Sequence, residues 1–131
     1  NLKCGLCRPC KRGKQNHCEN WTTIGIFQDG GFAKYVVVPQ KALHLVSDNV
    51  PLKDAIWIEL LSCIIGSTDR ISIQPGQTAA VIGAGPAGLL HALMFQAAGA
   101  KVFTGDVAPY RLNLAKQAGI ETVNVKEANL K

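Results

Sequence analysis

In the C-terminal half of the chain, apolar positions switch repeatedly between strand-like runs and helix-like spacing. Three short apolar runs are predicted strands, at residues 78–82, 101–105 and 121–125. Apolar residues recur every three or four positions in the two intervals, which predicts one helix ending at Gly99 and another running from Pro109 to Gly119. Strands that alternate with helices predict a parallel sheet of the α/β class.

The N-terminal half shows a different pattern, with turn residues around short apolar runs. The turn Asp29-Gly30-Gly31 precedes an aromatic and β-branched run over residues 32–38, which predicts a strand that Pro39 ends. Residues 42–46 are predicted to form a second short strand. This region therefore belongs to a β-rich part of the protein.

A helical region joins the two halves. Residues 52–71 carry apolar side chains at helical spacing after the turn at 47–51, and Gly66 is expected to interrupt or bend the helix. Glu59 stands among apolar residues, and a buried carboxylate is costly unless it is paired, hydrogen-bonded or bound to metal. Glu59 is either a helix-surface residue or a carboxylate that faces a cavity or a metal. Cys63 is interpreted as a small apolar core residue.

Composition limits the class of protein further. Of the 131 residues, 47% are hydrophobic and 18% are charged, which is typical of globular proteins and excludes intrinsic disorder. Residues 71–100 carry no charge, but their glycines, prolines and polar residues favour a buried strand, turn and helix over a membrane span. We expect a cytoplasmic protein with no membrane partner.

The net charge of +5 is confined to the start of the chain. Five cations and no acids lie in the first fourteen residues, and the basic and acidic residues elsewhere cancel. The same segment contains four of the five cysteines. These four are Cys4, Cys7, Cys10 and Cys18. The five cations are Lys3, Arg8, Lys11, Arg12 and Lys14.

The crowding of these cysteines favours a metal loop, because thiols separated by two residues are poorly placed to form disulfides. Zinc held by four thiolates is tetrahedral and closed to substrate, so we expect a structural site whose binding energy stabilises this loop. The neighbouring cations are candidates to offset the negative charge of the thiolates. His17 is an alternative ligand.

Three other interpretations of the segment are weaker. An iron–sulfur loop normally has a shorter last spacing and a proline after its last cysteine, where this chain has Glu19. A disulfide framework fits poorly with the dinucleotide motif described next. The charge would permit a zinc module that binds nucleic acid, but no aromatic residue precedes Trp21, and nucleic acid is disfavoured as a partner.

A dinucleotide-binding fingerprint follows the first predicted strand. The segment Gly83-Ala-Gly85-Pro-Ala-Gly88 opens the next helix, and Asp106 ends the next strand. The glycines allow a tight turn, close approach of a pyrophosphate and close packing of helix on strand. Asp106 can accept hydrogen bonds from a ribose and would repel a 2′-phosphate, which favours NAD over NADP, although Arg111 could host that phosphate. The predicted coenzyme residues are Gly83, Gly85, Pro86, Ala87, Gly88, Asp106 and Arg111.

A flavin-binding unit shares the glycine fingerprint, but it usually lies at the start of a chain and ends its second strand in glutamate. Three predicted strands are only half of a complete dinucleotide-binding fold.

The ordered combination resembles the zinc-containing medium-chain alcohol and polyol dehydrogenases, particularly the sorbitol and threonine dehydrogenase branch. The resemblance implies a GroES-like catalytic domain up to residue 58, with a zinc lobe at 1–20, and the first half of a Rossmann domain over 59–131. Glu59 matches the glutamate of the family's Glu-Pro-Leu segment, at or near the catalytic zinc, although Leu60 replaces the proline. Glu59 is thus a predicted catalytic and metal residue.

The resemblance also implies a function and a size. The parent enzyme would transfer hydride from a secondary alcohol or polyol to NAD, with zinc as Lewis acid, and would be a homodimer or homotetramer. The family's upstream catalytic-zinc ligands are not in this sequence, so we expect an internal fragment that is inactive alone. The alternative is a non-catalytic zinc- and dinucleotide-binding module, acting as a redox sensor or nucleic-acid binder.

Overall fold

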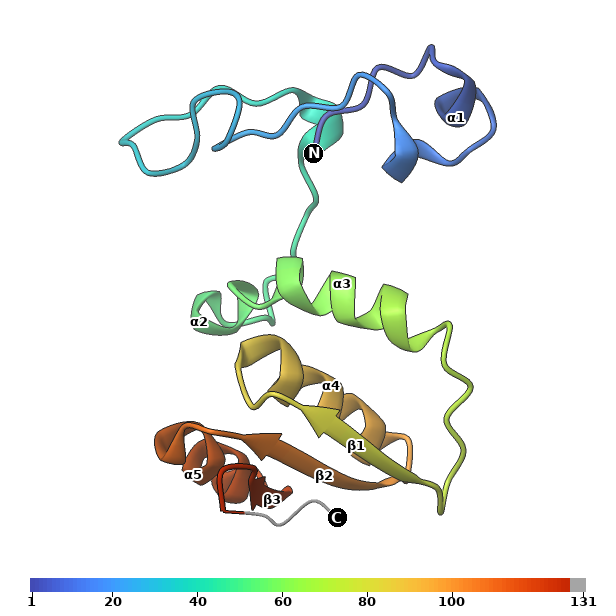
Figure 1. Ribbon diagram of the computed structural model, residues 1–131. Coiled ribbons are helices and arrows are strands. Elements are labelled where there is room, and N and C mark those ends of the chain that lie inside the picture. Colours follow the sequence, from blue (N-terminus) through green and yellow to red (C-terminus); the bar gives the residue numbers. More distant parts are fainter. Residues whose placement is uncertain (128–131) are drawn as a thin grey trace. The chain divides into compact units, whose positions relative to one another are not determined.

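The computed structural model describes residues 1–127 and divides the chain into two compact units, Asn1–Asn49 and Val50–Lys131 (Figure 1). The boundary predicted between the catalytic and coenzyme domains, after residue 58, lies nine residues beyond the boundary between these two units, which follows Asn49. The assignment of that boundary stays a prediction.

The second unit contains a three-stranded parallel sheet in the order β1-β2-β3. Thr78 pairs with Lys101, and Phe103 pairs with Glu121. Helices α4 and α5 connect successive strands and pack on the sheet (Figure 1). The bounds are β1 Thr78–Ile82, α4 Pro86–Ala97, β2 Lys101–Asp106, α5 Pro109–Gln117 and β3 Glu121–Asn124. The predicted α/β class and parallel sheet are confirmed.

A small apolar core joins both helices to one face of the sheet. Phe95 of α4 is the largest buried side chain in this cluster, and the other members are small or β-branched. They are Ala92, Ala100, Val102, Ala115 and Ile120. Thr104 of β2 is fully buried, and its hydroxyl donates to the carbonyl oxygen of Val81 at 3.1 Å. This bond holds β2 beside β1 just below the glycine loop.

The predicted helical region after residue 52 is present, but it breaks at a different place. Helix α2 spans Leu52–Ala55 and α3 spans Ile58–Thr68, so the break falls at Ile56 and Trp57. The expected interruption at Gly66 is wrong, because α3 continues through it and a single glycine costs a helix interior only about 1 kcal/mol. Helix α3 packs on α4.

The prediction that Cys63 is a core residue is also wrong. Its side chain is exposed on α3. Ile64 is the buried residue of this helix, at 3% exposure. The sequence pattern does not show which side chain of this run points inward, because both neighbours of Ile64 are apolar or small.

The first unit consists mainly of loops around short helices. Helix α1 spans Arg8–Lys11, and the 3-10 helices η1 and η2 span Gln15–His17 and Gln40–Ala42. An antiparallel bridge between Leu2 and Thr22 closes the zinc lobe.

The two predicted strands of the first unit are not formed. Residues 32–38 are irregular, and residue 42 belongs to η2. A strand needs a neighbouring chain to receive its backbone hydrogen bonds. Among residues 1–127 no segment pairs with 32–38, and Phe32 and Val37 are exposed. Residues 32–38 therefore have a strand-like sequence pattern, but no other described segment pairs with them.

Within the described part of the chain, no helix combines the length and apolar character needed to cross a bilayer.

Candidate zinc and coenzyme sites

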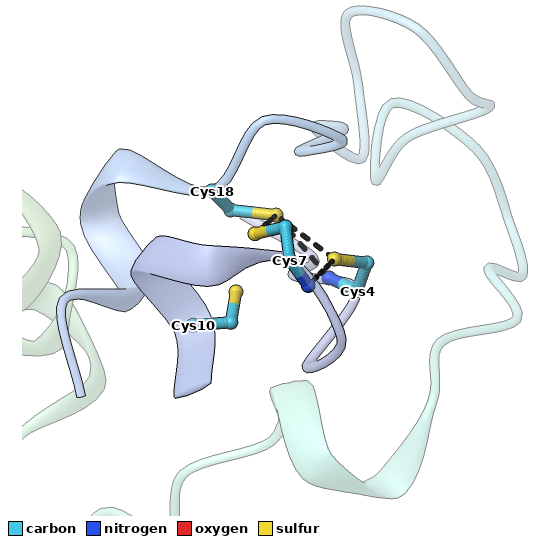
Figure 2. A group of neighbouring side chains, drawn as sticks. All are labelled: Cys4, Cys7, Cys10 and Cys18. Carbon is cyan, nitrogen blue, oxygen red and sulfur yellow. Dashed lines mark hydrogen bonds between the residues drawn. The ribbon is translucent and has the colours of Figure 1, made fainter. Parts of the chain in front are cut away.

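The zinc lobe brings the four predicted cysteine ligands together (Figure 2). Their sulfur atoms all lie within 4.8 Å of one another. The sulfur of Cys18 is 3.6 Å from that of Cys4 and 3.9 Å from that of Cys7. Four sulfurs around a tetrahedral zinc, at about 2.3 Å each, are about 3.8 Å apart. The four thiols therefore fit a zinc ion.

Local backbone geometry positions these sulfurs. Cys7 is the N-cap of α1, and Cys10 lies on that helix, so one turn presents both side chains. Gly5 and Gly13 adopt positive φ angles of 74° and 77°, which let the chain turn before and after α1. Cys18 follows η1 and returns the chain to the same point. The sequence spacing thus becomes a closed loop around the thiols.

Backbone amides supply several of the polar contacts to sulfur. The N–H groups of Leu6 and Cys7 both donate to Cys4 Sγ at 3.4 Å, and they lower the pKa of the Cys4 thiol to about 6. Burial raises the pKa of the Cys10 thiol to about 12. A bound cation must therefore displace the proton of Cys10.

The cations that we expected to compensate the thiolates are all exposed. The hydrogen bonds recorded to the sulfurs among residues 1–127 come from backbone amides, from other thiols and from Asn20. His17 is exposed and is not part of the cluster. All five cysteines are free thiols, which agrees with a metal loop and not with a disulfide framework.

The glycine loop has the geometry that a pyrophosphate needs. Gly83 has a φ angle of 101°, in the region that favours glycine. A Cβ atom on Gly88 would lie 1.8 Å from the carbonyl oxygen of Gly83, so only glycine fits there. A Cβ on Gly85 would meet no atom within 4 Å, which leaves open space beside the loop. Helix α4 packs against the loop, and room remains for a ligand.

The N-terminus of α4 offers donors to that space. Gly85 is the N-cap, Pro86 begins the helix, and no side chain caps it. The first amides of a helix have no intrahelical acceptors, and the helix dipole favours an anion at this end. The predicted residues Gly83, Gly85, Pro86, Ala87 and Gly88 thus form one continuous cradle.

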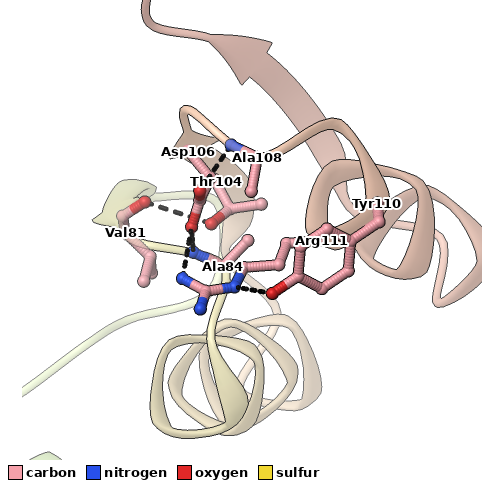
Figure 3. Close-up of polar contacts among 7 residues, drawn as sticks. All are labelled: Val81, Ala84, Thr104, Asp106, Ala108, Tyr110 and Arg111. Atoms are coloured by element: carbon pink, nitrogen blue, oxygen red, sulfur yellow. Dashed lines mark hydrogen bonds and ion pairs between the residues drawn. The ribbon is translucent and has the colours of Figure 1, made fainter.

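Asp106 lies at the end of β2 and is tied to the loop (Figure 3). Its Oδ2 atom accepts the N–H of Ala84 at 2.8 Å, and its Oδ1 atom accepts the N–H of Ala108 at 2.8 Å. The hydrogen bond from the Ala84 amide has the largest effect and that from the Ala108 amide the next largest, and together they hold the pKa of the Asp106 carboxyl below its usual range. The carboxylate is ionised and has lone pairs left for ribose hydroxyls.

Arg111 lies beside Asp106. Its Nη1 atom lies 3.6 Å from Asp106 Oδ2, and its Nε–H donates to the hydroxyl oxygen of Tyr110 at 2.9 Å. Tyr110 and the amide of Ala84 are not among the site residues predicted from the sequence. No periodicity or motif marks either, because both contacts depend on side-chain direction.

An apolar cavity of about 620 Å³ adjoins the loop in the second unit. Leucines of α4 and α5 line it together with Trp57, Tyr110 and Arg111, and the loop residues Ala84, Gly85 and Pro86 form one end. The loop and the guanidinium therefore share one concave surface.

Glu59 lies in the first turn of α3 and is exposed. Within residues 1–127 the cysteine quartet is the one cluster of three or more potential metal ligands, and Glu59 does not belong to it. The described residues thus bring together one candidate metal site, the cysteine quartet, and Glu59 is not part of it.

Comparisons with known proteins match both units. Residues 1–48 match the sequence profile of the alcohol dehydrogenase GroES-like domain. An L-threonine 3-dehydrogenase from Chelativorans sp. is 35% identical over 132 residues, covering 99% of this chain and 38% of the relative. Sorbitol dehydrogenase from Bacillus subtilis is 34% identical over 129 residues, covering 96% of this chain and 36% of that enzyme.

A solved structure agrees with these relatives. Galactitol-1-phosphate dehydrogenase from Escherichia coli superposes with a TM-score of 0.86 at 32% identity, covering 98% of this chain and 38% of that protein. The chain therefore spans little more than a third of the length of the proteins that it matches.

Proposed function

We propose, since this chain belongs to the family of zinc-type alcohol and polyol dehydrogenases, that it serves hydride transfer from a secondary alcohol or polyol to NAD. It carries part of the family's GroES-like domain, followed by the first half of a Rossmann sheet. The observation that carries the proposal is the cradle made by Gly83, Gly85 and Gly88 with the Asp106 carboxylate at its side.

Each residue of the cradle has a separate task. The first amides of α4 would bind the pyrophosphate, and open space at Gly85 lets it approach the backbone. The ionised Asp106 would accept hydrogen bonds from the adenosine ribose and disfavour a 2′-phosphate, which supports NAD as the coenzyme. When bound, the nicotinamide ring would accept the hydride from the alcohol.

The zinc lobe would have a structural task. Cys4, Cys7, Cys10 and Cys18 would fill all four positions of a zinc ion and leave none open to substrate. The bound zinc would stabilise the folded conformation of residues 1–20. A homodimer or homotetramer and a cytoplasmic location stay predictions.

The function can be tested on the purified 131-residue chain. We expect one zinc per chain by elemental analysis and measurable NAD binding by isothermal titration calorimetry. We expect no oxidation of sorbitol or threonine, because the described residues form no catalytic metal site. Failure to bind NAD at millimolar concentration would contradict the proposed coenzyme site. Robust turnover would contradict the proposal that this chain lacks a catalytic metal site.

Glu59 is proposed to act at or near the catalytic zinc of the complete enzyme. In that enzyme, Glu59→Gln should lower kcat by about 10-fold or more, because removing the carboxylate charge changes how the zinc polarises the alcohol. The zinc held by the four cysteines should stay in place. Exposed Glu19 offers a control, since Glu19→Gln should leave turnover unchanged. An unchanged kcat in the Glu59 variant would refute the role.

A further inference from the structure

The polar contacts at the end of β2 reach a residue without a role in the proposed coenzyme site. The hydroxyl oxygen of Tyr110, in the first turn of α5, accepts a hydrogen bond from Arg111 Nε at 2.9 Å (Figure 3). Arg111 Nη1 lies 3.6 Å from Asp106 Oδ2, which accepts the N–H of Ala84 at 2.8 Å. The contacts thus connect Tyr110 to the glycine loop.

The carboxylate and the guanidinium of this ion pair differ in how firmly they are held. Asp106 cannot move away, because two backbone amides bind its carboxylate and its side chain is only 5% exposed. Arg111 is 43% exposed at its side chain, so water can compete for its donors. Its distance to Asp106 is also longer than in a close guanidinium–carboxylate pair. The hydroxyl of Tyr110 is therefore the second anchor that keeps the guanidinium turned toward the carboxylate.

We propose that Tyr110 is a specificity-determining positioning residue for the coenzyme. Its hydroxyl holds Arg111 against Asp106 and so withholds the guanidinium from a 2′-phosphate. The inference rests on the proposed function, because it requires a dinucleotide at the glycine loop.

The charges around Arg111 explain why holding its guanidinium against Asp106 favours NAD. Asp106 repels a 2′-phosphate, which carries between about −1.5 and −2 charges at neutral pH. Arg111 is the cation in contact with this carboxylate, and it would have to leave Tyr110 to neutralise the phosphate. The hydroxyl groups of the NAD ribose require no such movement. Tyr110 therefore stabilises the arrangement that binds NAD.

The test is Tyr110→Phe, which removes only the hydroxyl group. NAD and NADP affinities of the purified chain would be measured by isothermal titration calorimetry. We expect NADP affinity to rise and NAD affinity to change little, so that the preference for NAD falls by about 2- to 10-fold, the worth of one hydrogen bond. Tyr35→Phe is a matched control, since Tyr35 is an exposed tyrosine of the first unit.

A double-mutant cycle separates positioning from a general effect on the fold. In an Arg111→Gln background, Tyr110→Phe should leave the ratio of NAD to NADP affinities unchanged. Tyr110→Leu repeats the test with a different side chain, and thermal unfolding checks that each variant is folded. Tyr110 is 63% exposed, so we expect these variants to fold.

The possible failures are distinguishable. If the unmodified chain binds no NAD, the proposed coenzyme site is wrong, and this inference is wrong with it. If NAD binds but the ratio stays constant in Tyr110→Phe, only the role of Tyr110 is wrong. The same conclusion follows if the ratio changes equally with and without Arg111.

Discussion

Cys18→Ser is expected to lower the zinc affinity of this chain by roughly 100- to 1,000-fold. Four-ligand peptides bind zinc with a free energy of about 10–16 kcal/mol at neutral pH, and one ligand of the four contributes about a quarter of that free energy. Cys18 is 3% exposed, and its sulfur lies within 4 Å of the sulfurs of Cys4 and Cys7. The serine oxygen is a poorer zinc ligand, so the lobe should also lose its ordered structure.

Zinc content by elemental analysis and the amide spectrum of residues 1–20 would check this result. Cys63→Ser is the matched control, because Cys63 is the one cysteine outside the cluster and is exposed. It should retain one zinc and the spectrum of the unmodified chain. A Cys18→Ser chain that bound zinc with undiminished affinity would show that the quartet is not the metal site.

Gly88→Ala should destabilise the second unit by about 1–3 kcal/mol and abolish NAD binding. The new Cβ atom would lie 1.8 Å from the carbonyl oxygen and 2.9 Å from the carbonyl carbon of Gly83. Both contacts are with backbone, so the loop or the start of α4 must move. Movement of either one breaks the cradle. Urea unfolding followed by calorimetric titration with NAD would measure the two effects.

Two other glycines provide controls for this variant. Gly66→Ala introduces a methyl group into open space in α3 and should raise stability by about 0.5–1 kcal/mol, because alanine favours helix. Gly85→Ala should keep the fold and lose NAD affinity, since its Cβ atom would fill only the space meant for phosphate. Equal loss of stability in all three variants would contradict a specific contact at Gly88.

The second unit could be predicted closely because its sequence pattern and its contacts are both local. Short apolar runs and turn residues predict the strand at 78–82, the helix that ends near Gly99 and the helix opened by Pro109, and all three are present. Residues 32–38 have an equally strong strand pattern and remain irregular. A strand is completed by its neighbour, which a local pattern does not contain.

The candidate sites show the same limit at the level of side chains. The four clustered cysteines could be recognised from spacing alone, because a loop of fifteen residues can close in few ways. The bond from Ala84 to Asp106 and the position of Tyr110 could not, because they depend on where side chains point after folding. The exposure of Cys63 was missed for that reason too.

The order of the strands has a consequence for how this protein is made. Each strand of β1-β2-β3 pairs with the next one in the chain, and a single helix separates each pair. Thr78 pairs with Lys101 and Phe103 with Glu121, so each pairing closes a loop of only about 20 residues and costs less loop-closure entropy than a pairing across the whole chain. Ribosomes add only about 5–20 residues per second, so this half-sheet has time to close while synthesis continues. We therefore expect the coenzyme cradle to be an early folding unit that forms co-translationally.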